Sequence, residues 1–175
     1  AQDPHCMVVN FGDGAFSQGA VAEALNFAAV DKAPVIFVCE NNGWAISTPL
    51  HKQSGTDIFA ARGAGYGVHS IRVDGNDILA MMTVMQEACE RARQGDGPTL
   101  IEAVTFRMSL HTTADDPKVY RDDALVEPWQ DRCPIRRMER WLIRTCRPEQ
   151  SDPDRIRQEC EQEVLDARER FREEA

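Results

Sequence analysis

The sequence lacks the features that mark several large classes of protein. No apolar run approaches the roughly 20 residues that cross a bilayer, and no N-terminal stretch has the pattern of a signal peptide. Positive charge is scarce: the chain has 20 Lys and Arg but 29 Asp and Glu, so its formal net charge is −9. This balance argues against nucleic acid and against an anionic membrane surface as partners.

Closely spaced cysteine pairs are also absent. The six cysteines include no CxxC pair, which argues against a zinc site, and a chain of 175 residues needs no disulfide framework. Free thiols are typical of a reducing compartment, so a cytosolic type of environment is expected. The cysteines are Cys6, Cys39, Cys89, Cys133, Cys146 and Cys160.

What remains has the composition of a globular protein. Charged residues make up 28% and hydrophobic residues 42% of the chain, and its length suffices for one domain with a core. The chain begins at Ala1 without a methionine and enters an apolar segment at Cys6. We therefore expect a piece of a longer or processed protein.

Apolar segments and helix-forming segments alternate between residues 7 and 106. Short apolar or β-branched runs predict strands, and Ala-rich or capped segments predict helices. This order predicts an α/β fold, a parallel sheet with helices on both faces. The expected strands are 7–11, 35–40, 69–73 and 98–106, and the expected helices are 18–31, 57–62 and 77–93.

The rest of the chain divides into a polar stretch and an acidic tail. Residues 107–128 show no periodicity, and connections of this length are often functional. Residues 148–175 hold ten acids and five arginines, more than half of the net charge. A narrow apolar stripe there predicts a helix capped by Ser151 that docks on its own domain, or alternatively on a partner. The stripe comprises Ile156, Cys160, Val164, Ala167 and Phe171.

Polar residues with glycine follow the first expected strand. The glycines of Gly12-Asp13-Gly14-Ala15 let main-chain N–H groups approach an anion at the start of a helix. Asp13 would repel a phosphate there unless a divalent cation lay between them. Ser17 occupies the third glycine position of a nicotinamide-binding fingerprint, which disfavours that class. Taken alone, the triplet is equally consistent with a plain turn.

A second group of oxygen donors follows the next strand. The chain between Gly14 and Asn41 suffices for one helix and one strand, which returns it to the same edge of the sheet. Asp13, the side-chain oxygen of Asn42 and the main-chain oxygen of Trp44 then form a set of hard ligands. Two phosphate oxygens and a water would complete the octahedron that Mg²⁺ prefers at ~2.1 Å. The spacing therefore predicts a diphosphate site with Mg²⁺.

The motifs resemble those of a known family. The spacing of two motifs is similar to the signature of thiamine diphosphate enzymes: the triplet GDG is followed, after 26 residues, by the pair NN. Over about residues 7–146, the ordered motifs resemble the alpha subunit of the decarboxylating component of 2-oxo acid dehydrogenase complexes. These motifs are FGDGAFSQGAVAEALNFAA, ENNGWAISTP, SIRVDGNDILA, GPTLIEAVTFR and HTTADDPKVYR.

The resemblance implies roles for individual residues. Asp13, Asn42 and the main-chain oxygen of Trp44 would ligate Mg²⁺, and residues 12–15 would bind the diphosphate through Gly12, Asp13, Gly14 and Ala15. His111 matches the active-site histidine, which borders the cofactor and supports substrate handling and acyl transfer. Residues that order the surrounding loop in the family match Asp115, Asp116, Tyr120 and Arg121.

The resemblance also implies an activity and partners. The expected reaction is oxidative decarboxylation of a 2-oxo acid, with acyl transfer to a lipoyl-bearing acyltransferase component. A branched-chain substrate is placed slightly ahead of pyruvate, and a non-catalytic assembly fragment is the alternative from another class. A beta subunit would complete the active site in an alpha₂beta₂ assembly, in the cytoplasm of a bacterium or the mitochondrial matrix of a eukaryote.

The expected organisation follows from this resemblance. Residues 1–128 would form a thiamine diphosphate- and Mg²⁺-binding domain whose fold is incomplete at the N-terminus. Residues 129–175 would form a C-terminal helical extension.

Overall fold

The computed structural model describes residues 5–145 and 152–174. The chain divides into two compact units, one ending at Pro134 and the other beginning at Ile135. The predicted domain boundary after residue 128 stays a prediction.

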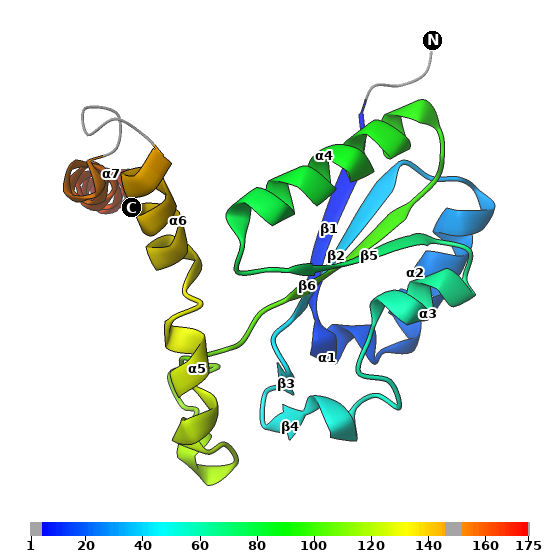
Figure 1. The fold of residues 1–175 in the computed structure, drawn as a ribbon, viewed down its shortest axis with the longest axis horizontal. Helices are drawn as coiled ribbons and strands as arrows, with labels where there is room; N and C mark the ends of the chain where they lie inside the picture. The colour runs from blue at the N-terminus through cyan, green and yellow to red at the C-terminus, as the bar shows by residue number, and fades with distance from the viewer. Residues whose placement is uncertain (1–4, 146–151, 175) are drawn as a thin grey trace. The chain divides into compact units, whose positions relative to one another are not determined.

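The first unit is built on a sheet of four parallel strands (Figure 1). The strand order is β1-β2-β6-β5, so the connection from β2 to β5 passes over the position that β6 later fills. The predicted parallel sheet is thereby confirmed. The strands are β1 (Met7–Gly12), β2 (Val35–Asn41), β5 (His69–Asp74) and β6 (Thr99–Val104).

Helices cover both faces of this sheet, as the sequence predicts. Helices α2 (Gly19–Val30) and α3 (Ala60–Gly65) lie on one face, and α4 (Ile78–Gln94) lies on the other (Figure 1). Asp77 caps α4, because its side chain accepts hydrogen bonds from the main-chain N–H groups of the first turn. Gly95 ends the same helix with a φ of 79°, a conformation that glycine adopts at little cost.

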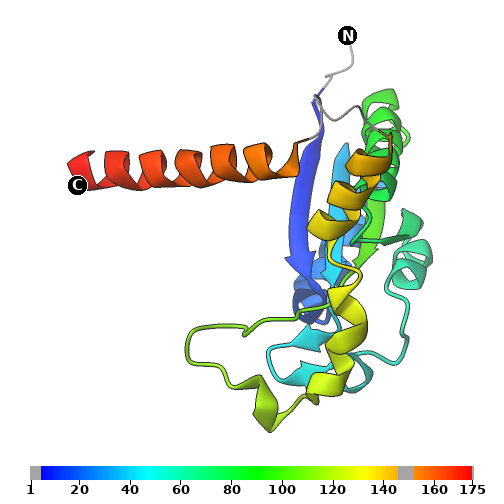
Figure 2. The ribbon, with the colours of Figure 1, turned by 60° about the vertical axis from the view of Figure 1, so that its left-hand side comes forward.

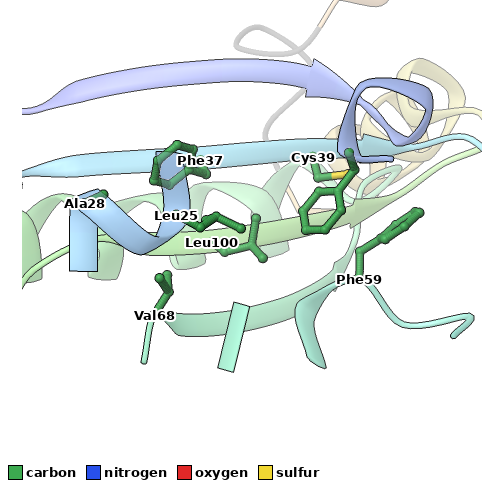
Figure 3. Packing of buried hydrophobic residues seen from close by; sticks show 8 residues of the cluster. Leu25, Ala28, Phe37, Cys39, Phe59, Val68 and Leu100 are labelled. Atoms are coloured by element: carbon green, nitrogen blue, oxygen red, sulfur yellow. The ribbon is translucent and has the colours of Figure 1, made fainter. Parts of the chain in front are cut away.

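Strand β2 contributes side chains to a core on each face, because successive residues of a strand point to opposite sides. Phe37 and Cys39 pack with residues from α2 and β6 in one cluster, which Figure 3 shows from close by. Ile36 and Val38 pack in the other cluster, against Ala88 of α4. Both clusters contain fully buried side chains, which gives this small unit a core on each side of the sheet.

A buried acid connects three elements of the first unit. Glu102 lies in the interior of β6 and is 0% exposed. Its carboxylate accepts hydrogen bonds from Asn41 Nδ2 at 2.8 Å, from the main-chain N of Ala60 at 2.9 Å and from Arg72 Nε at 3.4 Å. The end of β2, the start of α3 and strand β5 therefore share one acceptor.

Short elements follow the strands at their carboxyl ends. Helix α1 (Asp13–Phe16) follows β1, and a two-stranded hairpin follows β2. Residues 107–128, for which the sequence predicts no regular element, contain two 3₁₀ turns and the start of α5. Aspartate side chains cap both 3₁₀ turns. The hairpin comprises β3 (Trp44–Ala45) and β4 (Thr48–Pro49); the other short elements are η1 (Leu50–Lys52), η2 (Pro117–Val119), η3 (Asp123–Leu125) and α5 (Glu127–Gln130).

The second unit consists of helical segments. Helix α6 (Pro134–Thr145) begins at the boundary between the units, and α7 (Pro153–Glu174) is one uninterrupted helix (Figure 2). Asp152 caps α7 by accepting hydrogen bonds from two main-chain N–H groups of the first turn. Ser151, the predicted cap, lies outside the described residues.

The apolar stripe of α7 is exposed. Val164 is 59% and Phe171 is 74% exposed, and an ion pair at 2.6 Å joins Arg157 of α7 to Glu139 of α6. Docking of the stripe on the chain's own domain or on a partner therefore stays a prediction. Within the two described ranges, no helix is both long and apolar enough to pass through a membrane.

The three hydrogen bonds of Glu102 predict a large effect of its removal. Glu102→Leu leaves buried donors without an acceptor, so we expect the free energy of unfolding to fall by about 3–5 kcal/mol. Glu102→Gln retains one acceptor oxygen, so we expect its free energy of unfolding to lie between those of Glu102→Leu and the wild type. Urea denaturation measures both, with the exposed Glu90→Leu on α4 as the control; equal midpoints for Glu102→Leu and the control would contradict the prediction.

Candidate functional site

Asp13 is a buried carboxylate at the carboxyl end of β1. It is the first residue of α1, and 1% of its surface is exposed. Burial raises the pKa of Asp13 above its usual value, while hydrogen bonds from Gln53 and from the main-chain N–H groups of Asp13, Gly14 and Asn42 oppose that rise. Asp13 therefore lies against the turn that follows β2.

The turn after β2 is held by its two asparagines. The side-chain oxygen of Asn41 accepts a hydrogen bond from Gly43 N at 3.2 Å, and that of Asn42 accepts one from Trp44 N at 3.0 Å. An amide oxygen has two lone pairs, so the Asn42 oxygen retains one for a further ligand. Gly43 has a φ of +82°, which a residue with a side chain rarely adopts. The structure thus brings Asp13 and Asn42 together, as their spacing predicts.

The two glycines beside Asp13 have different surroundings. A Cβ atom added at Gly14 would lie 2.8 Å from the Cβ atom of Ala45, so Gly14 allows α1 to pack against β3. A Cβ atom added at Gly12 would meet no atom of the described chain within 4 Å. Space therefore remains at Gly12, the residue that precedes the buried carboxylate.

The available donors suit a hard divalent cation. Across residues 5–145 and 152–174, no group of three His, Cys, Asp or Glu side chains could hold a metal ion. A cation at Asp13 would consequently need amide, main-chain or ligand oxygens as well. Asn42, the main chain of Trp44 and a diphosphate supply that chemistry, which fits Mg²⁺. The assignment of these residues as ligands stays a prediction.

His111 lies on an exposed loop that Asp115 organises. One oxygen of the Asp115 carboxylate accepts hydrogen bonds from the main-chain N of His111 at 2.8 Å and from the Tyr120 hydroxyl at 2.7 Å. Both hydrogen bonds hold the pKa of Asp115 below its usual value, and the one from the His111 main chain has the larger effect. Burial and the bond to Asp115 raise the pKa of Tyr120. The backbone of His111 is therefore fixed, while its side chain stays accessible.

The loop is attached to the hairpin that follows Asn42. Arg107 donates to the Tyr120 hydroxyl at 2.8 Å and to the main-chain oxygen of Ile46 at 2.6 Å. The rings of Trp44 and Tyr120 lie 5.4 Å apart. Ile46 has a φ of +55°, which costs a β-branched residue about 1–3 kcal/mol. The strained residue and the two aromatic rings connect the loop of His111 to the turn of Asn42.

Two further residues expected to order the loop also make contacts. Arg121 is 6% exposed and donates to the main-chain oxygens of Arg107 and Met108, the latter at 3.0 Å. Asp116 caps the 3₁₀ turn η2 by accepting a hydrogen bond from Lys118 N. The sequence did not predict the contacts of Arg107 with Ile46 or of Gln53 with Asp13, because both depend on the paths of irregular segments.

Comparison with known proteins identifies the family of the chain. The sequence matches the family described as dehydrogenase E1 component over residues 1–175. The chain belongs to the dehydrogenase E1 component family. The predicted resemblance is thereby confirmed, and the motifs GDG and NN, which the structure places side by side, lie within the matched region.

Curated relatives of this E1 chain include subunits of two substrate types. It is 54% identical over 135 residues to the 3-methyl-2-oxobutanoate dehydrogenase subunit alpha of Mycobacterium tuberculosis, covering 77% of this chain and 37% of that protein. It is 45% identical over 156 residues to the pyruvate dehydrogenase E1 component subunit alpha of Acholeplasma laidlawii, covering 89% and 45%. The chain thus spans less than half the length of these relatives.

A third curated relative is a mitochondrial protein. The mitochondrial 2-oxoisovalerate dehydrogenase subunit alpha of Homo sapiens is 47% identical over 139 residues, which are 78% of this chain and 31% of that protein. Among solved structures, a transketolase from Pichia stipitis aligns with a TM-score of 0.49 and 26% identity, over 57% of this chain and 15% of that chain.

The two glycines of the E1 chain give a matched pair of substitutions. Gly14→Ala pushes α1 away from β3, so we expect it to lower both the unfolding temperature and the Mg²⁺-dependent affinity for thiamine diphosphate. Gly12→Ala adds a Cβ atom that meets no atom of the described chain within 4 Å, so it is expected to preserve the unfolding temperature while weakening cofactor binding. Thermal unfolding and calorimetric titration of the assembled enzyme separate the two effects; equal losses of stability would contradict the assignment.

Loop order is expected to depend on the Asp115 carboxylate. Because its pKa lies below the usual 3.8, the carboxylate's stabilising contribution is fully present above that pH and is lost as the pH falls below it. At neutral pH, Asp115→Asn should therefore raise the hydrogen–deuterium exchange of residues 107–121. Asp123→Asn, at an exposed aspartate of the same segment, serves as the control and should leave that exchange unchanged.

Proposed function

We propose that this E1 chain forms the Mg²⁺- and diphosphate-binding part of the alpha subunit of a 2-oxo acid dehydrogenase. The enzyme would decarboxylate a 2-oxo acid oxidatively and pass the acyl group to a lipoyl group. The observation that carries this proposal is the buried Asp13, which lies beside the Asn42 turn and next to the open space at Gly12. Membership of the dehydrogenase E1 component family supports the proposal.

Each residue of the site has a distinct part in this proposal. Asp13, Asn42 and the main-chain oxygen of Trp44 hold Mg²⁺, which offsets the repulsion between Asp13 and the diphosphate. Residues 12–15 offer main-chain N–H groups to the phosphate oxygens, with Gly12 leaving room for their approach. Thiamine diphosphate supplies the electron sink for loss of CO₂.

His111 acts on the substrate side of the site. Its side chain is exposed, and its main chain is fixed through Asp115. An imidazole can donate a proton or carry a positive charge near neutral pH, which suits handling of an anionic 2-oxo acid and of the acyl group. The Asp115–Tyr120–Arg107 network sets the position from which His111 works.

A branched-chain 2-oxo acid is the preferred substrate. The branched-chain relative from Mycobacterium tuberculosis is 54% identical, and the pyruvate relative from Acholeplasma laidlawii is 45% identical. Pyruvate is the second candidate because that relative aligns over a larger share of the chain. The proposed partners are a beta subunit, in an alpha₂beta₂ assembly, and a lipoyl-bearing acyltransferase component.

Release of CO₂ by the enzyme assembled with its beta subunit tests the activity and the substrate together. We expect faster release from 3-methyl-2-oxobutanoate than from pyruvate, in a reaction that requires both Mg²⁺ and thiamine diphosphate. Faster release from pyruvate would reassign the substrate. Absence of CO₂ from both substrates would refute the enzymatic proposal and favour a role in assembly.

Substitution of Asp13 and of His111 should affect different steps. Asp13→Ala removes a metal ligand and should abolish Mg²⁺-dependent retention of the cofactor. His111→Ala should leave cofactor binding largely intact and lower acyl transfer to lipoyl by roughly 10²- to 10⁴-fold, the usual contribution of general acid–base catalysis. His51→Ala, at an exposed histidine after the hairpin, is the control. Unchanged cofactor occupancy in Asp13→Ala would refute the ligand assignment.

A further inference from the structure

Gln53 contacts the buried carboxylate of the site. It follows the 3₁₀ turn η1, and its side-chain nitrogen donates hydrogen bonds to Asp13 Oδ2 at 3.2 Å and to the main-chain oxygen of Thr48 at 3.0 Å. Both amide hydrogens are therefore used within the chain. One of them connects the segment after the hairpin directly to the carboxylate at the start of α1.

The orientation of this amide follows from the charge beside it. The reverse orientation would set the amide oxygen against a carboxylate oxygen, and these two acceptors would have no hydrogen between them. The nitrogen consequently faces Asp13. This leaves one oxygen of the Asp13 carboxylate free of the Gln53 amide.

The oxygen of the same amide is buried without a donor. Within the described part of the chain, Gln53 Oε1 makes no hydrogen bond and is shielded from solvent. An unsatisfied buried acceptor is costly, so buried polar atoms of this kind normally have a partner. Because this oxygen has almost no exposed surface, a donor can reach it only if the Gln53 side chain shifts when a ligand binds beside Asp13.

We infer that Gln53 is a positioning residue of the cation site. Its nitrogen fixes one oxygen of Asp13 and thereby orients the other toward the cation. Mg²⁺ gives up its waters reluctantly and requires near-octahedral geometry, so it is sensitive to how its ligands are held. This role rests on the proposed function, because it presupposes a cation at Asp13.

Mn²⁺ is the probe for this role, because it replaces Mg²⁺ at oxygen sites and its bound water is observable by proton relaxation. Gln53→Met keeps the length of the side chain and removes both its donor and its acceptor. In the assembled enzyme with saturating thiamine diphosphate, we expect the dissociation constant of Mn²⁺ to rise roughly 10- to 100-fold, the usual effect of losing such a contact. The water relaxation rate of the bound Mn²⁺ should change as well.

Stability of the cofactor-free enzyme separates positioning from a merely structural role. Removal of an unsatisfied acceptor offsets the lost hydrogen bonds, so Gln53→Met should leave the unfolding temperature close to that of the wild type. Gln86→Met, at an exposed glutamine on α4, is the matched control and should alter neither quantity. A Gln53→Met enzyme that unfolds earlier yet binds Mn²⁺ with wild-type affinity and relaxation would overturn the inference.

Asp13→Ala in the same titration distinguishes this inference from the proposed function. If the wild type binds Mn²⁺ and Asp13→Ala does not, the cation site stands, and the result for Gln53→Met decides the inference alone. If Asp13→Ala binds Mn²⁺ as the wild type does, the cation site itself is refuted, and the inference about Gln53 is refuted with it.

Discussion

The parallel pairing of β1 with β2 is the constraint on which the candidate site depends. In this register Gly12 lies opposite Glu40, so the residues that follow each strand emerge at the same edge of the sheet. Asp13 then meets the turn of Asn42 without any long-range folding of loops. If the register of β1 against β2 shifted by two residues, each side chain would stay on the same face of the sheet. The Asp13 carboxylate, however, would move about 7 Å along the strand, away from that turn.

Two buried acids in this unit have opposite consequences for stability. Glu102 receives hydrogen bonds from three elements and holds them together. Asp13 has a raised pKa, so its ionised form is less favourable in the folded chain than in the unfolded one. At neutral pH this charge therefore lowers the stability of the cation-free protein. A cation would offset that cost, which couples binding to folding at the start of α1.

The sequence predicts the parts of this structure that depend on periodicity and strand order. Alternating apolar runs are sufficient for the parallel sheet and for helices on both faces, and the rule that sites follow strand ends selects Asp13 and Asn42. Gln53 and Arg107 could not be predicted as contacts, because their partners depend on the paths of a hairpin and of a long loop. Helix α6 was expected only as part of the C-terminal helical extension of residues 129–175.

The hairpin after Asn42 is held from two sides, and this arrangement explains the strain at Ile46. Arg107 binds the carbonyl of Ile46 from the loop of His111, and Gln53 lies between the hairpin and Asp13. A left-handed β-branched residue persists only where its surroundings compensate for its cost. Here the compensation comes from the two segments that carry the candidate chemistry. The hairpin is thus a shared support: the residues proposed to bind the cation and the loop of His111 are positioned through the same few residues.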